Sequence, residues 1–318
     1  MKKTIICLIL LVSWLLSACQ ATNKPGNLTG NEKILIIGNS HSVDAFHFLQ
    51  LAFQEQHPDK NLTLGVLYYS GCSIDKHLQF AQNNDAVYRY YKNTSGDWTT
   101  TKTQTMEDVL CDQQWDIVIL QAAKSDLDDT LNLDGRRALE AYINEHLKNA
   151  HEFMWHTSWP SPNDDSFFAP DATKPAPNGY KENLIKLYGF DPFNQYAVLA
   201  TKATEHILTD ATYAKALSTG AAIMHAYLSE GLPQTSLWRD YTHLNDYGRL
   251  IAAYALLAQL DGQPITNISI NTISEEHRHS MFKDEGPLIL TEELKNILIS
   301  AANYSLSNPF TIPPKTAE

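Results

Sequence analysis

The chain has 318 residues, of which 43% are hydrophobic and 19% are charged, so it can bury the core of one large α/β domain. Its formal net charge is −12, and the first 18 residues carry two lysines and no acid, which leaves −14 for the rest. This excess of acidic residues argues against nucleic acid as a partner and against electrostatic binding to anionic lipid. The charge does not identify a substrate.

The N-terminal residues have the pattern of a secretion signal. Met1-Lys2-Lys3 is a short positive region, and Thr4–Leu16 is an apolar run too short to span a membrane comfortably. The run closes on Leu-Ser-Ala-Cys, which resembles the lipobox of bacterial lipoproteins, where the cysteine carries the lipid. The resemblance implies lipid attachment at Cys19, whereas the alternative is an ordinary signal peptide cut nearby.

These features divide the start of the chain into a lipoprotein signal peptide at 1–18 and a flexible polar tether at 19–32. They predict a lipid-anchored protein of the bacterial cell envelope that meets the membrane through its N-terminal lipid only. Gln20 follows the cysteine where an aspartate would favour inner-membrane retention, so the outer membrane or the periplasmic face is favoured.

Short apolar runs alternate with amphipathic segments along the rest of the chain. The expected strands span Lys33–Gly38, Asn61–Tyr69, Trp115–Leu120, Glu152–His156 and Thr212–Ser218. One helix is expected to begin near Ser42. Three more are expected over Gln195–Leu208, Ala221–Glu230 and Leu250–Leu260. This alternation predicts an α/β fold, in which a mostly parallel five-stranded sheet lies between two layers of helices.

One domain is expected over 33–263, because no linker is long enough to demand a second. Residues 157–193 are rich in Pro, Asp, Asn and aromatic residues without clear periodicity, so we expect an insertion near the site. Residues 264–318 are expected to form a C-terminal extension that packs on the same domain, with one helical stretch at Thr291–Ala302.

Four small or polar residues lie where functional groups are expected in such a fold. Parallel sheets hold their sites beyond the carboxyl ends of the strands, and Ser40, Gly71, Gln121 and Thr157 all fall just there. A serine hydroxyl becomes a nucleophile when a base takes its proton, and that base is usually a histidine held by a carboxylate.

Asp240 and His243 provide such a pair, three residues apart and just before the last expected helix, for which Asn245 is a suitable N-cap. One loop can present both groups, with the carboxylate bracing the ring nitrogen that faces away from the serine. Ser40, His243 and Asp240 are therefore the candidate catalytic residues.

The same segments resemble a known family. Gly38-Asn39-Ser40 after the first strand resembles the G-D-S block of the SGNH (GDSL-type) hydrolases, with Asn39 where aspartate is usual. Asp240-x-x-His243 resembles their last block, and the glycine of YYSGCS resembles the glycine of their second block. The resemblance covers most of 33–260. It implies a flavodoxin-like α/β/α fold and an enzyme that hydrolyses acyl or acetyl esters.

The resemblance also implies a role for each matching residue. Ser40 would be the nucleophile, His243 the base and Asp240 its orienting acid. The backbone N–H groups of Ser40 and Gly71 would stabilise the oxyanion. The family's G-x-N-D block after the third strand is missing here, and Gln121, at the equivalent strand end, is the candidate for the third oxyanion donor. We expect no metal and no cofactor.

The serine block has alternatives that the sequence leaves open. Ser40 could instead cap the following helix, since serine is a favoured N-cap, and Ser42 is a rival nucleophile two residues on. His41, beside Ser40, more naturally lines the pocket or meets solvent than acts as the base.

The identity of the acid that orients the histidine also has alternatives. Asp240 could pair with Arg239 or Arg249 as a solvated charge, which would leave His243 an ordinary surface or core histidine. Asp246 is near enough to compete with Asp240, although its place in the first turn of the last helix suits the helix dipole.

Two further groups of residues have two interpretations each. Cys72 and Cys111, the cysteines left after the signal, either form a disulfide or are two small buried residues. Five aromatic residues either stack on sugars near the site or pack beneath the loops: Trp155, Trp159, Phe167, Phe168 and Trp238.

The sequence therefore predicts an exported serine esterase that acts on a small-molecule or polysaccharide ester, with an acetylated or acylated carbohydrate preferred. The alternatives are a non-catalytic lipoprotein that binds glycans or envelope components on the same fold, a lipid esterase, or an acyltransferase that uses the same serine.

Overall fold

A central sheet of seven strands organises the part of the chain that the computed structural model describes, which is 28–122, 133–172, 174–230, 232, 237–275 and 287–314. Its strands are, in chain order, β1 (Lys33–Gly38), β2 (Thr63–Tyr68), β3 (Tyr88–Asn93), β4 (Trp98–Gln104), β5 (Ile117–Leu120), β6 (Glu152–Thr157) and β7 (Tyr213–Ser218). They lie in the order β4-β3-β2-β1-β5-β6-β7. The strands β2, β1, β5, β6 and β7 are parallel neighbours, whereas β3 is antiparallel to both β2 and β4.

The predicted flavodoxin-like α/β fold is confirmed, but the predicted number of five strands is too low. The five expected strands are the parallel ones, and the hairpin of β3 and β4 adds two more. The sequences YRYYKN and WTTTKTQ lack the apolar run of a strand buried on both faces, and most of β4 is exposed at the edge of the sheet.

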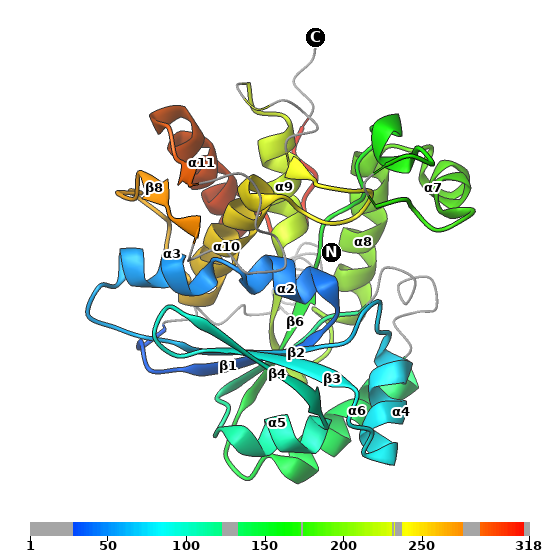
Figure 1. The fold of residues 1–318 in the computed structure, drawn as a ribbon, viewed down its shortest axis with the longest axis vertical. Coiled ribbons are helices and arrows are strands. Elements are labelled where there is room, and N and C mark those ends of the chain that lie inside the picture. Colours follow the sequence, from blue (N-terminus) through cyan, green and yellow to red (C-terminus); the bar gives the residue numbers. More distant parts are fainter. Residues whose placement is uncertain are drawn as a thin grey trace, which may run out of the picture.

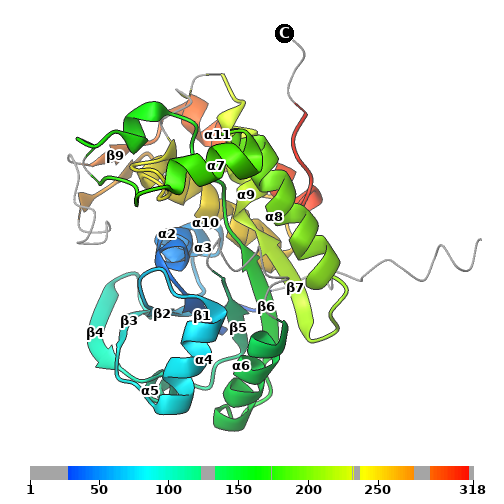
Figure 2. The same ribbon diagram turned by 90° about the vertical axis from the view of Figure 1, so that its right-hand side faces the viewer.

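Helices cover both faces of the sheet (Figure 1). One layer consists of α2 (Ser40–Phe46), α3 (Leu49–Gln56), α9 (Thr219–Tyr227), α10 (Asp246–Asp261) and α11 (Glu292–Ser307), and the other of α4 (Ile74–Asn83), α5 (Met106–Asp112) and α6 (Leu133–His146). Figure 2 shows α7 (Tyr180–Tyr188), from the insertion, and α8 (Pro192–His206) on the same side of the sheet as α10. The short helix η2 (Asp165–Phe168) and the two-stranded pair β8 (Thr272–Ile273) and β9 (Leu288–Ile289) complete the described elements.

The helix α10 is the buried centre of the larger layer. Every residue from Gly248 to Leu260 is buried, and the helix packs on α2, α3, α9 and α11. The Asn245 side chain caps it by accepting the Gly248 N–H at 3.1 Å, and a Cβ on Gly248 would overlap the Leu237 carbonyl. The loop that leads into α10 is therefore fixed against α2, which follows β1.

The predicted signal peptide and Cys19 lie outside the described residues. Leu28, within the stretch expected as a tether, is only 6% exposed, and the Asn61 N–H donates to the Gly30 carbonyl at 3.2 Å. The packed part of the chain thus includes 28–32. No helix among the described residues has both the length and the apolar character needed to cross a membrane.

A buried histidine in β6 predicts that acid destabilises the fold. His156 is 1% exposed, its Nε2 lies 2.9 Å from Thr219 Oγ1, and burial lowers its pKa to about 3. The unfolded chain binds a proton at this residue near pH 6.5 but the folded protein does not, so stability is lost as the pH falls below 6.5. Between pH 7 and pH 5 the loss through this residue should be about 2 kcal/mol.

Urea unfolding at both pH values measures this loss. The His156→Gln variant should lose about 2 kcal/mol less than the wild type over the same pH step, whatever its stability at pH 7. An equal loss in the two proteins would mean that His156 is not neutral in the folded state.

Candidate active site

The turn after β1 places Ser40 at the first position of α2. The Asn39 side chain accepts the His41 N–H at 3.0 Å and so caps the helix. The capping role that the sequence left open for Ser40 thus belongs to Asn39. A Cβ on Gly38 would overlap Ser42 Oγ and lie 2.6 Å from Gln121 Oε1, so only glycine fits at this strand end.

Ser40, His243 and Asp240 form one hydrogen-bonded chain. Ser40 Oγ lies 2.8 Å from His243 Nε2, and His243 Nδ1 lies 2.9 and 2.8 Å from the two carboxylate oxygens of Asp240. A carboxylate only accepts, so Nδ1 carries the proton and Nε2 is left to accept the serine hydroxyl. This is the arrangement that a nucleophilic serine with a histidine base requires.

The environment of Asp240 keeps it ionised. Burial by itself raises the pKa of this carboxyl, but the hydrogen bond and charge of the His243 ring, with the backbone N–H groups of Thr242 and His243, lower the pKa well below its ordinary value. Those two N–H groups donate to Oδ1 at 2.9 and 2.8 Å. The carboxylate therefore holds the imidazole in one tautomer and orientation.

Asp44, on the same helix as Ser40, ties that helix to the loop of His243. Asp44 is fully buried and accepts hydrogen bonds from Arg239 Nη1 (3.0 and 3.1 Å), Arg249 Nε (3.1 Å) and the Leu244 N–H (3.0 Å). Arg239 and Leu244 flank the segment that carries Asp240 and His243. The ion pairs thus hold the acid and base in place against α2.

The same ion pairs show which acid contacts the histidine. Arg239 and Arg249 pair with Asp44 and not with Asp240. Asp246 lies in the first turn of α10 and accepts Arg249 Nη1 at 2.8 Å, away from the His243 ring. Of the acids considered from the sequence, Asp240 is the one that contacts His243.

The turn after β2 lies beside the start of α2. The Tyr69 N–H donates to the Gly38 carbonyl at 3.3 Å, and Asn39 Nδ2 donates to the Cys72 carbonyl at 3.4 Å. Gly71, between them, has a φ of +58°, which glycine adopts without strain. A Cβ at Gly71 would meet nothing within 4 Å, so the backbone conformation and not crowding favours glycine.

Gln121, at the end of β5, is fully buried and supports the serine turn. Its Oε1 accepts the Asn39 N–H at 3.1 Å and the Ser42 hydroxyl at 2.9 Å, and its Nε2 donates to the Ala122 carbonyl. The predicted role of Gln121 as an oxyanion donor stays a prediction. The rival nucleophile Ser42 is fully buried and is bonded to Gln121 rather than to His243.

Two further residues lie beside the triad: His41, which was expected to line the pocket or meet solvent, and Lys174, which the sequence did not single out. His41 is 5% exposed, its Nδ1 lies 3.1 Å from Ser158 Oγ and its Nε2 lies 3.0 Å from Thr242 Oγ1. The ring is therefore buried against the loop that carries Asp240 and His243, and it does not meet solvent. Lys174, in the insertion, is 53% exposed and places Nζ 3.1 Å from His243 Nδ1 and 3.6 Å from Asp240 Oδ2. Because Nδ1 already donates to Asp240, the ammonium acts on the carboxylate. A single lysine in an aperiodic segment gives no sequence signal for such a contact.

Trp155, Trp159 and Trp238 are at most 2% exposed, so they are packed in the interior and do not face a sugar. Phe168 contacts other aromatic rings: Tyr180, Phe190 and Tyr241. Cys72 is buried and Cys111 is exposed, and the two form no disulfide with each other, so the interpretation as small buried residues holds for Cys72 alone. In the described part of the chain, no three His, Cys, Asp or Glu side chains are grouped so that they could hold a metal ion.

Comparison with known proteins identifies a family and similar folds. The model of a family described as "Domain of unknown function (DUF4886)" matches residues 33–282. The crystal structure of a DUF4886 family protein from Bacteroides uniformis ATCC 8492 is similar, with a TM-score of 0.69 at 23% identity over 89% of this chain and 97% of that chain. A comparison with curated proteins gives no match.

Two other solved structures are similar to this chain at a lower level. A candidate SGNH hydrolase from Slackia heliotrinireducens has a TM-score of 0.41 at 15% identity, over 72% of this chain and 99% of that chain. A variant of an acetyl xylan esterase from Geobacillus stearothermophilus has a TM-score of 0.42 at 14% identity, over 76% and 99%.

The ion pairs of Asp44 generate a stability prediction. Replacing Asp44 with Asn should lower the free energy of unfolding by about 3–5 kcal/mol, because the buried Arg249 and the half-buried Arg239 lose the carboxylate that they share. Asp112→Asn is the matched control, since Asp112 pairs with Lys92 at the surface (2.7 Å), and it should cost about 1 kcal/mol or less. Urea unfolding measures both, and equal effects would contradict the structural role of Asp44.

Proposed function

The chain belongs to the DUF4886 family, and we propose that it is a serine esterase that removes acyl or acetyl groups from a carbohydrate. One observation carries the proposal: Ser40 Oγ lies 2.8 Å from His243 Nε2, while His243 Nδ1 is held by Asp240 at 2.8–2.9 Å. These residues come from segments about 200 positions apart, and the geometry suits proton transfer from the serine to the imidazole.

The proposed reaction has two halves. Ser40 Oγ bonds to the ester carbonyl carbon as its proton passes to His243 Nε2, and the carbonyl oxygen becomes an oxyanion that accepts the N–H groups of Ser40 and Gly71. His243 then gives the proton to the leaving alcohol oxygen as the C–O bond breaks. In the second half, water loses a proton to His243, attacks the acyl-serine and releases the acid, and Ser40 regains its proton.

A second candidate is a binding lipoprotein without catalysis. The arrangement of Gln121 favours it, because its Nε2 donates to the Ala122 carbonyl and its Oε1 faces the serine turn. An esterase that lacked one oxyanion donor would be slower by roughly 10²–10³-fold. The envelope location and the carbohydrate substrate, in either case, are proposed from the N-terminal sequence and from the resemblance to exported esterases.

Labelling of the nucleophile separates the two candidates. A fluorophosphonate probe should add once to the wild type, and the adduct should be absent from Ser40→Ala and present in the control Ser42→Ala, as read by intact mass. Hydrolysis of 4-nitrophenyl acetate should fall by about 10⁴-fold or more in Ser40→Ala. A folded wild type that is neither labelled nor active on esters from acetyl to long acyl chains would exclude the esterase.

The proposed anchor is tested separately. Metabolic labelling with palmitate should mark the full chain, and Cys19→Ala should abolish the label and release the protein from the membrane fraction. An unlabelled wild type, or a label that persists in Cys19→Ala, would contradict lipid attachment at this cysteine.

A further inference from the structure

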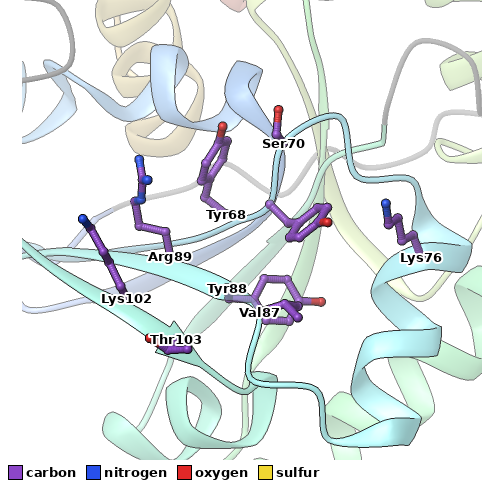
Figure 3. Close-up of a pocket in the computed structure, with 9 residues that line it drawn as sticks. Tyr68, Ser70, Lys76, Val87, Tyr88, Arg89, Lys102 and Thr103 are labelled. Atoms are coloured by element: carbon purple, nitrogen blue, oxygen red, sulfur yellow. The ribbon is translucent and has the colours of Figure 1, made fainter.

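A pocket of about 510 Å³ opens at the carboxyl end of β2, between the start of β3, the end of β4 and the first turn of α4 (Figure 3). Its lining includes Ser70, the residue before the proposed oxyanion glycine Gly71. The register of β1 and β2 pairs Gly38 with Tyr68, and Tyr68 also lines the pocket. The pocket and the nucleophile Ser40 thus lie beyond the ends of two adjacent strands. A volume of this size suits one or two sugar rings.

Three cationic side chains line this pocket: Lys76, Arg89 and Lys102. Arg89 and Lys102 are directly opposite each other across β3 and β4, and Figure 3 shows them side by side. Like charges in such a pair destabilise a sheet. In the part of the chain that the structure describes, neither Lys76 nor Lys102 has a carboxylate partner, whereas Lys92, on the same hairpin, pairs with Asp112 at 2.7 Å.

This cationic cluster contrasts with the net charge of −12 for the whole chain. Acidic residues are the commoner charged type, yet among the described residues none lines the pocket. Repulsion between the neighbouring cations Arg89 and Lys102 is relieved when an anion binds between them. The charges therefore point to an anionic ligand.

Two tyrosines give the pocket an aromatic border. Tyr68 and Tyr69 are half-buried, the Arg89 guanidinium lies 6.0 Å from the Tyr68 ring, and Lys76 Nζ lies 4.7 Å from the Tyr69 ring. In Figure 3, Tyr68 points to the same side as Arg89 and Lys102. A sugar ring packs its C–H groups on an aromatic face and offers hydroxyls to the tyrosine oxygens, so tyrosines beside cations suit an acidic sugar.

A β-bulge shapes the edge of the pocket. The register of β3 and β4 shifts between Tyr88 and Arg89, so that Thr103 is the extra residue, and its φ is +64°. A β-branched residue in the left-handed region is strained, and such strain is concentrated at functional sites. The bulge adjoins Lys102 and sets the direction in which its side chain leaves the strand.

We propose that this pocket binds an anionic sugar, a hexuronate or a sulfated sugar, in the polysaccharide whose neighbouring unit carries the ester. The inference rests on the proposed esterase for the ester, although binding of the anionic sugar does not require catalysis. The substrate class is then an acylated acidic polysaccharide, which Lys76, Arg89 and Lys102 hold while the acyl group lies at Ser40.

Calorimetric titration of the full chain carrying Ser40→Ala tests the proposal without turnover. Trigalacturonate supplies the carboxylate, a sulfated galactose trisaccharide supplies the sulfate, and xylotriose is the neutral control. At least one anionic trisaccharide should bind, more weakly as NaCl is raised, and xylotriose should bind at least ten times more weakly. The tighter of the two anionic ligands identifies the source of the charge.

Variants of exposed lysines locate the site. Lys102→Met should weaken anionic binding about tenfold or more, and Lys102→Arg should restore it. Lys148→Met is the matched control, because Lys148 is an exposed lysine just before β6, at the opposite end of the strands, and it should leave binding unchanged. Circular dichroism melts check that each variant is folded.

Three results would overturn the proposal: no binding of either anionic trisaccharide, equal binding of xylotriose, or equal weakening by Lys148→Met. The fluorophosphonate result stands apart from these. Labelled Ser40 without anionic binding overturns the pocket alone, and anionic binding without labelled Ser40 supports the pocket in a non-catalytic lipoprotein.

Discussion

The structure of the site depends on one buried carboxylate. Asp44 is fully buried, and a charge in that position costs several kcal/mol unless cations and hydrogen-bond donors surround it. Its partners Arg239 and Arg249 lie 195 and 205 positions away, one on each side of His243. To satisfy Asp44, the chain must bring this loop onto α2, and Ser40 lies one helical turn away on that helix. The contact between hydroxyl and imidazole thus follows from an ion pair that takes no part in the chemistry.

A second set of contacts fixes the serine itself. β1 lies between β2 and β5, which is where the strand order reverses and where doubly wound folds place their ligands. Gly38 allows Gln121 to approach the strand end, and Gln121 in turn accepts the Asn39 N–H and the Ser42 hydroxyl. Because these groups are buried and bonded to one another, the turn has little freedom, and Ser40 is its one residue with partial access to solvent.

Some of these features can be predicted from the sequence, and others cannot. The strands of the parallel sheet are short apolar runs because they are buried on both faces. The strands β3 and β4 lack such a run, because a hairpin at the edge of the sheet needs few apolar residues, and so the sequence did not predict them. Ser40, Asp240 and His243 stand out because each lies at the end of an element with a partner of matching chemistry. Asp44 does not stand out in the sequence, because an acidic residue within a helical pattern is usually exposed to solvent. The orientation of Gln121 depends on Asn39 and Ser42, which are brought to it only by the tertiary fold.

The acidity of the chain also bears on how an anionic polymer would bind. A net charge of −12 repels an acidic polysaccharide at long range, but at physiological salt this repulsion is screened beyond about 8 Å. Contacts at the pocket act at shorter distances, where Lys76, Arg89 and Lys102 outweigh the distant acids. Attraction is then confined to the strand ends beside Ser40, and the rest of the surface rejects the polymer. This charge distribution makes binding selective for one position along the polymer. Association is slower than it would be with long-range electrostatic attraction.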